Sequence, residues 1–231
     1  TVQLFEVQPA DLSDSKTAAV ALRSAAPRVN DPPAYDGNDT FQVGPEAAVW
    51  MTGALANGAL TTKLPRDLTP AEVKRFRLIV PIGGGSLRLD LYGVHVQATT
   101  NDKGMTEGQF HGVVRKQDID TQIIPSVAEL VTAQINMFPA APGTQTLITT
   151  FETGPVSQKK CQDNMADCCR TNPKTCKITP DEVRANQLIQ IILVPDLQCY
   201  DAQGSWKPIP NGVDKDCLSV GLGFTAVRAK Y

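Results

Sequence analysis

Apolar and polar residues alternate along much of the chain, and this period of two is typical of strands that bury one face. The clearest stretch is 87–92, where leucines alternate with Arg88, Asp90 and Tyr92. The turn-forming pair Asn57–Gly58 divides a second stretch and predicts a hairpin. Strands are predicted at residues 2–7, 41–43, 47–62, 76–82, 87–98, 106–115, 146–151 and 218–229.

Other segments have features of helices. One long segment places its apolar residues at helical spacing, and Pro125 within it predicts a kink or a restart. Thr69 with Glu72, and Thr179 with Glu182, have the hydroxyl and carboxylate spacing of a capping box, with proline between them at the first helical position. An alanine-rich segment ends at a proline. Helices are predicted at residues 14–26, 70–75, 118–138 and 180–193.

Turns are frequent, since the 231 residues include 17 glycines and 17 prolines. Residues 28–38 predict a loop and residues 83–85 a turn. We expect a mainly β fold: an antiparallel β-sandwich with a few peripheral helices and a disulfide-stapled C-terminal region. It is expected to be a single domain over residues 1–231, with a cysteine-rich subregion at 155–217.

All six cysteines lie in the last third of the chain, and an even number in a confined region indicates disulfides. Fifteen pairings are formally open, and those that join the neighbours Cys168 and Cys169 are disfavoured by ring strain. Cys199–Cys217 is the favoured pair because it closes a turn-rich loop. The other four would pair among themselves and hold a polar segment. The six are Cys161, Cys168, Cys169, Cys176, Cys199 and Cys217.

A zinc site is the alternative use of these thiols. No Cys-x-x-Cys pair occurs, however, and His95 and His111 lie far upstream. Disulfides indicate an oxidising compartment, so we expect a secreted, periplasmic or cell-surface protein. The chain starts with Thr1, which suits removal of a signal peptide, although a trimmed chain would look the same.

The charge pattern excludes some partners. The net charge is −2, which provides no field to attract nucleic acid. Lys159–Lys160 is the one short basic pair, and we interpret it as part of a solvated face. No apolar run is long enough to span a bilayer as a helix.

No motif of nucleotide binding, metalloprotease or serine hydrolase chemistry occurs, so no catalytic residue is predicted. His95 and His111 lie in predicted strands, where a hydrogen-bonded or exposed histidine is the simpler interpretation. Scattered acids leave a carboxylate-dependent hydrolase open. Four aromatic residues suggest either a sugar-stacking platform or ordinary packing: Tyr35, Trp50, Tyr200 and Trp206.

A calcium site is a further hypothesis for the C-terminal region. Asp201 and Gln203 offer side-chain oxygens in one loop, and three more acids lie nearby in sequence. Glu182 falls at the twelfth position of a calcium-loop-like segment that has no carboxylates at its earlier positions. The alternative is a polar turn held by a disulfide. The predicted ligands are Glu182, Asp196, Asp201, Gln203, Asp214 and Asp216.

Roughly the last 60 residues also carry a pattern of short motifs. These are Ile178-Thr-x-x-Glu182-Val, Leu188-Ile189, Val194-Pro-Asp and Asp216-x-Leu-Ser-Val-Gly-Leu-Gly-Phe-Thr-Ala226. The pattern resembles exported proteins and lipoproteins of myxobacterial type, in which calcium-loop-like segments precede similar motifs. Here cysteines stand where that group tends to have acids. The resemblance implies an exported location and no particular activity.

Three hypotheses for function follow. The first is a non-catalytic secreted or cell-surface protein, structural or adhesive, that assembles with copies of itself through a sheet edge. The second is a binding module for glycan or lipid, which would need an aromatic row or an apolar cavity. The third is the carboxylate-dependent hydrolase, which would need two acids in a cleft.

Overall fold

The structure, a computed structural model, describes residues 2–9, 14–27, 33–82, 85–209 and 211–230. Two compact units make up the chain. The sheet unit contains Thr1–Leu78, Asp90–Arg115 and Pro195–Tyr231, and the helical unit contains Ile79–Leu89 and Lys116–Val194.

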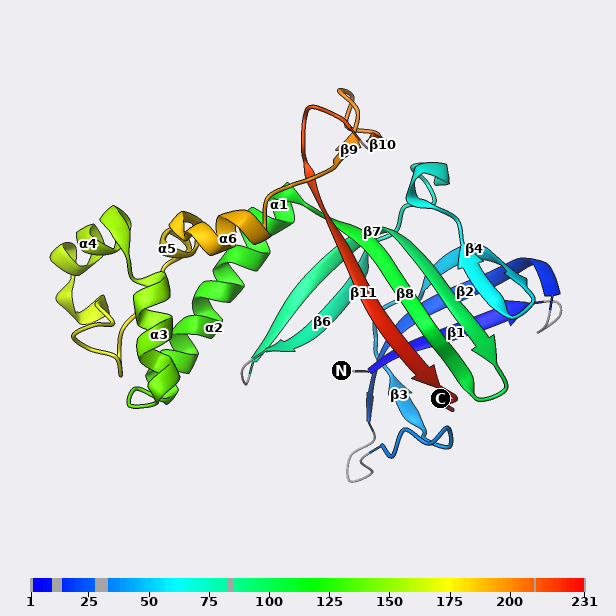
Figure 1. The fold of residues 1–231 in the computed structure, drawn as a ribbon, viewed down its shortest axis with the longest axis horizontal. Coiled ribbons are helices and arrows are strands. Elements are labelled where there is room, and N and C mark those ends of the chain that lie inside the picture. The colour runs from blue at the N-terminus through cyan, green and yellow to red at the C-terminus, as the bar shows by residue number, and fades with distance from the viewer. Residues whose placement is uncertain (1, 10–13, 28–32, 83–84, 210, 231) are drawn as a thin grey trace. The chain divides into compact units, whose positions relative to one another are not determined.

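Nine strands form one large sheet in the order β1-β2-β4-β5-β7-β8-β11, with β3 paired to β2 and β6 to β7 (Figure 1). Every pair whose register is described is antiparallel. A two-stranded sheet joins β9 and β10. The strands are β1 (Val2–Pro9), β2 (Asp14–Pro27), β3 (Phe41–Val43), β4 (Val49–Ala56), β5 (Ala59–Thr62), β6 (Phe76–Ile82), β7 (Gly85–Asn101), β8 (Gly104–Arg115), β9 (Gln198–Tyr200), β10 (Trp206–Ile209) and β11 (Cys217–Val227).

The large sheet is curled into a half-barrel. β1 and β11 stand at opposite ends of the strand order, yet the rings of Phe5 and Phe224 stack with their centroids 4.6 Å apart. The concave face is filled by a hydrophobic cluster of Val20, Leu55, Leu60, Ala98 and Met105. The mainly β prediction is confirmed. The expected sandwich is replaced, among the described residues, by this one curled sheet, because its own two ends close over the core.

The predicted turn at Asn57–Gly58 joins β4 to β5. Both residues have positive φ, 50° and 77°, as a two-residue hairpin turn requires. Loop 28–38 is free of helix and strand over residues 33–38, and its first part lies outside the described residues. The predicted turn at 83–85 also falls mostly outside them.

Three helix and strand predictions are wrong. Residues 14–26 form strand β2, which pairs with β1 on one side and with β3 and β4 on the other, and its residues Ala18, Ala21 and Ala25 are buried. Residues 146–151 belong to helix α3 (Pro142–Phe151). Residues 70–75 form a turn without a helix, although Glu72 still accepts hydrogen bonds from the main chain and hydroxyl of Thr69.

The first helices of the helical unit are α1 (Lys116–Asp118), a π-helical turn η2 (Ile119–Ile123) and α2 (Ile124–Met137). Pro125 stands at the start of α2, so the restart predicted there is confirmed. The capping box at Thr179 is formed, but Asn186 ends the first helix and caps a second. The remaining helices are η1 (Pro65–Asp67), which belongs to the sheet unit, α3 (Pro142–Phe151), α4 (Gly154–Asp163), η3 (Met165–Asp167), α5 (Pro180–Ala185) and α6 (Gln187–Ile192).

Candidate ligand-binding groove

An apolar groove lies where the two ends of the curled sheet meet. Alternate residues of a strand share one face, so Gln3, Phe5 and Val7 of β1 point the same way. Phe5 and Val7 pack against the concave cluster together with Phe224 and Ala226 of β11. The sheet therefore brings the first and last strands of the chain to one site.

Two adjoining cavities form this site. The larger, here called the β1–β11 groove, has a volume of about 810 Å³ and is lined by Phe5, Val7, Leu55, Met105 and Ala226 among others. The smaller, here called the apolar pocket, has a volume of about 140 Å³. Its walls are almost entirely aliphatic and aromatic: Phe5, Leu22, Phe76, Leu78, Phe110, Leu222 and Phe224. A groove of this size is in the range of sites for small organic ligands.

Gln3 lines both cavities, and its side chain has no hydrogen-bond partner among the described residues. The amide nitrogen Nε2 and the oxygen Oε1 are both buried without a hydrogen bond. A buried amide left in this state costs roughly 1–3 kcal/mol. Gln3 therefore offers a hydrogen-bond donor and an acceptor to whatever fills the site.

The groove also has a charged rim. Arg228 and Lys230 follow Ala226 at alternate positions and line the same groove, as does Asp102. Both cations are exposed, and no ion pair joins either one to an acid within the described residues. The rim carries a net positive charge beside apolar walls.

The predicted calcium ligands do not form one cluster. The carboxylate of Asp201 accepts hydrogen bonds from the main chain of Gln203 and Ser205, at 3.0 and 2.9 Å, and so closes a turn. Asp216 accepts from the main chain of Cys199 at 2.6 Å. Gln203 itself is exposed.

The remaining predicted calcium ligands have different surroundings. Asp196 accepts from the main chain of Ser219 at 2.7 Å and from its hydroxyl, Asp214 is exposed, and Glu182 belongs to the helical unit. Within the described residues, close groups of three ligating side chains contain at most one of the predicted acids. Calcium binding stays a prediction with no geometric support.

Of the four aromatic residues considered for glycan stacking, only Trp206 and Tyr200 have a ring contact with each other among the described residues. Trp206 is buried, donates its indole hydrogen to the carbonyl oxygen of Pro65 at 3.0 Å, and meets Tyr200 edge to face at 5.8 Å. Trp50 lies near Arg23, and Tyr35 lies near Phe41. Ordinary packing accounts for Trp206 and Tyr200.

His95 and His111 are cross-strand partners on β7 and β8, with ring centroids 6.2 Å apart. His95 is buried, and its Nδ1 contacts the hydroxyl of Thr62 and the carbonyl of Lys63. Its Nε2 has no hydrogen-bond partner within the part of the chain that the structure describes. Burial lowers the pKa of His95, and His111 adds a small repulsion. These contacts make His95 a buried sheet residue.

The three disulfides are Cys161–Cys168, Cys169–Cys176 and Cys199–Cys217. The favoured pair is confirmed, and so is pairing of the other four among themselves. Both close groups with three or more metal-ligating side chains in the described part of the chain contain two of these bonded sulfurs, which no longer offer thiolates. The zinc alternative therefore has no free ligands there.

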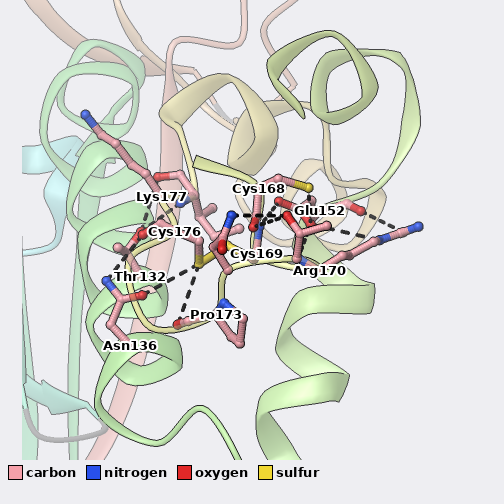
Figure 2. Close-up of a disulfide and its surroundings, with 12 residues drawn as sticks. Thr132, Asn136, Glu152, Cys168, Cys169, Arg170, Pro173, Cys176 and Lys177 are labelled. Atoms are coloured by element: carbon pink, nitrogen blue, oxygen red, sulfur yellow. Dashed lines mark hydrogen bonds and ion pairs between the residues drawn. A yellow bond between two sulfur atoms is a disulfide. The ribbon is translucent and has the colours of Figure 1, made fainter. Parts of the chain in front are cut away.

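The stapled segment 161–176 folds around an acid that sequence reasoning missed. Glu152 is 2% exposed, and it accepts hydrogen bonds from the main chain of Cys169 at 2.6 Å and of Arg170 at 2.9 Å (Figure 2). Asn136 of α2 donates to the carbonyl of Cys176 on the other side of the same disulfide. The buried carboxylate of Glu152 and two disulfides therefore hold segment 161–176 in place, where few apolar side chains are available to do so.

Lys160 completes this cluster. Its ammonium lies 2.9 Å from Oε1 of Glu152 and 3.0 Å from Oε1 of Glu182. Lys159 next to it is exposed and pairs with Asp163, so the solvated interpretation of the basic pair holds for Lys159 and is wrong for Lys160. The two glutamates share one cation, and neither lines the groove or the apolar pocket.

No family model, curated protein or solved structure matches the chain. In the described part of the chain, no helix has the length and apolar character needed to cross a membrane.

Proposed function

We propose that this chain is a binding module for an apolar or amphipathic small molecule, which it takes into the β1–β11 groove. The main support for the proposal is a groove of about 810 Å³ that adjoins the apolar pocket. The unpartnered amide of Gln3 supports it, since a ligand or water must satisfy that group. We place the protein outside the cytosol because its three disulfides are typical of an oxidising compartment.

Titration with a neutral fluorescent probe, N-phenyl-1-naphthylamine, tests this function. We expect saturable binding to one site per chain with enhanced emission. Val7→Phe narrows the groove and should weaken binding at least tenfold, whereas Gln8→Phe, on the exposed neighbour, should leave binding unchanged. Circular dichroism controls for folding of both variants. Absence of saturable binding, or equal weakening by both variants, would remove the proposal.

The second candidate is a structural or adhesive protein that assembles with copies of itself. It is favoured by the two ends of the sheet, where β1 pairs with β2 and β11 with β8, so that each has an outer edge without a strand partner in the described residues. Size-exclusion chromatography with light scattering tests it. A strict monomer at high protein concentration would count against assembly.

A further inference from the structure

The walls of the groove change in character along a single strand. On β11 and the residues after it, the alternate positions are Leu222, Phe224, Ala226, Arg228 and Lys230. Leu222 and Phe224 line the apolar pocket, whereas Ala226, Arg228 and Lys230 line the groove. At about 3.3 Å per residue, Arg228 lies roughly 13 Å along the strand from Phe224. That distance suits a hydrocarbon chain with a polar head at one end.

Aromatic rings line the apolar end. Phe5 and Phe224 stack at 4.6 Å, and Phe76 meets Phe110 edge to face at 5.4 Å. Of the residues that the structure describes, no charged side chain lines the apolar pocket, so a charged group placed there would lose water without gaining a counter-ion. The ligand end that enters this pocket is therefore a hydrocarbon.

The other end has two cations and one acid. Arg228 and Lys230 are without an ion pair in the described part of the chain, and Asp102 is the single acid among the residues that line the groove. A carboxylate at this end would gain charge-assisted hydrogen bonds, which are roughly twice as strong as neutral ones. A neutral head would gain less, and a cationic head would be repelled.

We infer that the groove takes a single-chain anionic amphiphile, with its hydrocarbon in the apolar pocket and its head between Arg228 and Lys230. This inference rests on the proposed function and specifies its ligand class. Because Gln3 sits where both cavities meet, its amide hydrogen-bonds the polar part of the ligand or the water beside it.

The test compares dodecanoate with dodecanol, each displacing N-phenyl-1-naphthylamine from the full chain. Dodecanoate should bind roughly tenfold more tightly, and added salt should reduce its affinity without affecting that of dodecanol. Arg228→Gln with Lys230→Gln should abolish the difference, with each displacement corrected for that variant's own affinity for the probe. The control variant, Arg66→Gln with Lys207→Gln, removes the same charge from exposed positions outside the groove. It should retain the preference for dodecanoate over dodecanol.

The outcomes separate the two proposals. If the probe binds but dodecanoate and dodecanol compete equally, the anionic ligand class is overturned and the binding function stands. If both charge variants lose the preference equally, the assignment of the head to Arg228 and Lys230 is overturned. If the probe does not bind at all, the proposed function fails and this inference falls with it.

Discussion

Replacing Lys160 by alanine should destabilise the helical unit far more than replacing its neighbour Lys159. Lys160 is 10% exposed and lies between carboxylates that are 1% and 0% exposed, at 2.9 and 3.0 Å. It also donates to the carbonyl of Lys177 at 2.7 Å. Breaking a buried ion pair by removing one partner costs about 3–5 kcal/mol, because the remaining charge is left uncompensated.

Other donors reduce this cost towards its lower limit. Glu152 keeps two main-chain hydrogen bonds and an arginine 3.9 Å away. Glu182 keeps the two donors of Thr179, at 2.8 and 3.0 Å. We therefore expect Lys160→Ala to lower the free energy of unfolding by about 3 kcal/mol.

Urea unfolding followed by far-ultraviolet circular dichroism measures this loss, because helices α1–α6 all belong to the helical unit. With an m value of about 2 kcal/mol per molar, the midpoint should fall by roughly 1.5 M. Both tryptophans, Trp50 and Trp206, lie in the sheet unit, so their fluorescence follows that unit separately.

Lys159→Ala is the matched control on the same helix. Lys159 and its partner Asp163 are 76% and 60% exposed, and such a pair contributes about 0.5 kcal/mol or less. Equal effects of the two alanine variants on the dichroism midpoint would refute the buried cluster.

Three further predictions concern the sheet unit. Changing Cys199 and Cys217 together to serine should lower the free energy of unfolding by about 3 kcal/mol, because the disulfide closes a loop of 18 residues in the unfolded chain. Urea unfolding followed by tryptophan fluorescence measures this loss. Burial lowers the pKa of His95, so as the pH falls the unfolded state protonates this histidine before the folded state does. The free energy of unfolding should therefore fall as the pH drops below about 6.5, and urea midpoints measured between about pH 7 and pH 5 test this. Gly93→Ala should lower the free energy of unfolding by at least about 2 kcal/mol, since Gly93 has φ +58° and a β-carbon there would lie 2.4 Å from the ring of Trp206. Displacement of that ring should also shift tryptophan emission to longer wavelength.

Each of these predictions has a control. For the disulfide, the control is loss of Cys161–Cys168, which has a sequence separation of 7 and belongs to the helical unit. Its loss should leave the fluorescence transition unchanged, and a shift as large as that caused by losing Cys199–Cys217 would contradict the prediction. For pH, His95→Gln should flatten the acid slope, and an unaltered slope would contradict the assignment to this histidine. For Gly93, the comparison is Gly143→Ala, where a β-carbon meets nothing within 4 Å. A similar loss at both glycines would argue against the contact with Trp206.

Local patterns were enough to predict much of the sheet. Alternation found most strands because each buries one face, and Asn57–Gly58 marked a hairpin because its backbone needs positive φ. The pair Cys199–Cys217 followed from its spacing around a turn-rich loop. These features depend on residues close in sequence.

The wrong predictions fall where contacts between residues distant in sequence determine the structure. The alanines of β2 favour a helix locally, but pairing with β1 and β4 outweighs that preference. The burial of Lys160 had no sequence signal, since nothing in a Lys-Lys pair distinguishes the exposed member from the buried one. The groove exists because the sheet curls until Phe5 meets Phe224, and neither residue is exceptional by itself.

The final strand has a consequence for how the chain is made. Cys217 of β11 lies opposite Arg115 of β8, although about a hundred residues separate them in sequence. Loop-closure entropy opposes so distant a pairing, and β11 is synthesised about a hundred residues after β8. While β11 is still being synthesised, β8 has an open edge, which makes pairing with a neighbouring chain a hazard until β11 is available.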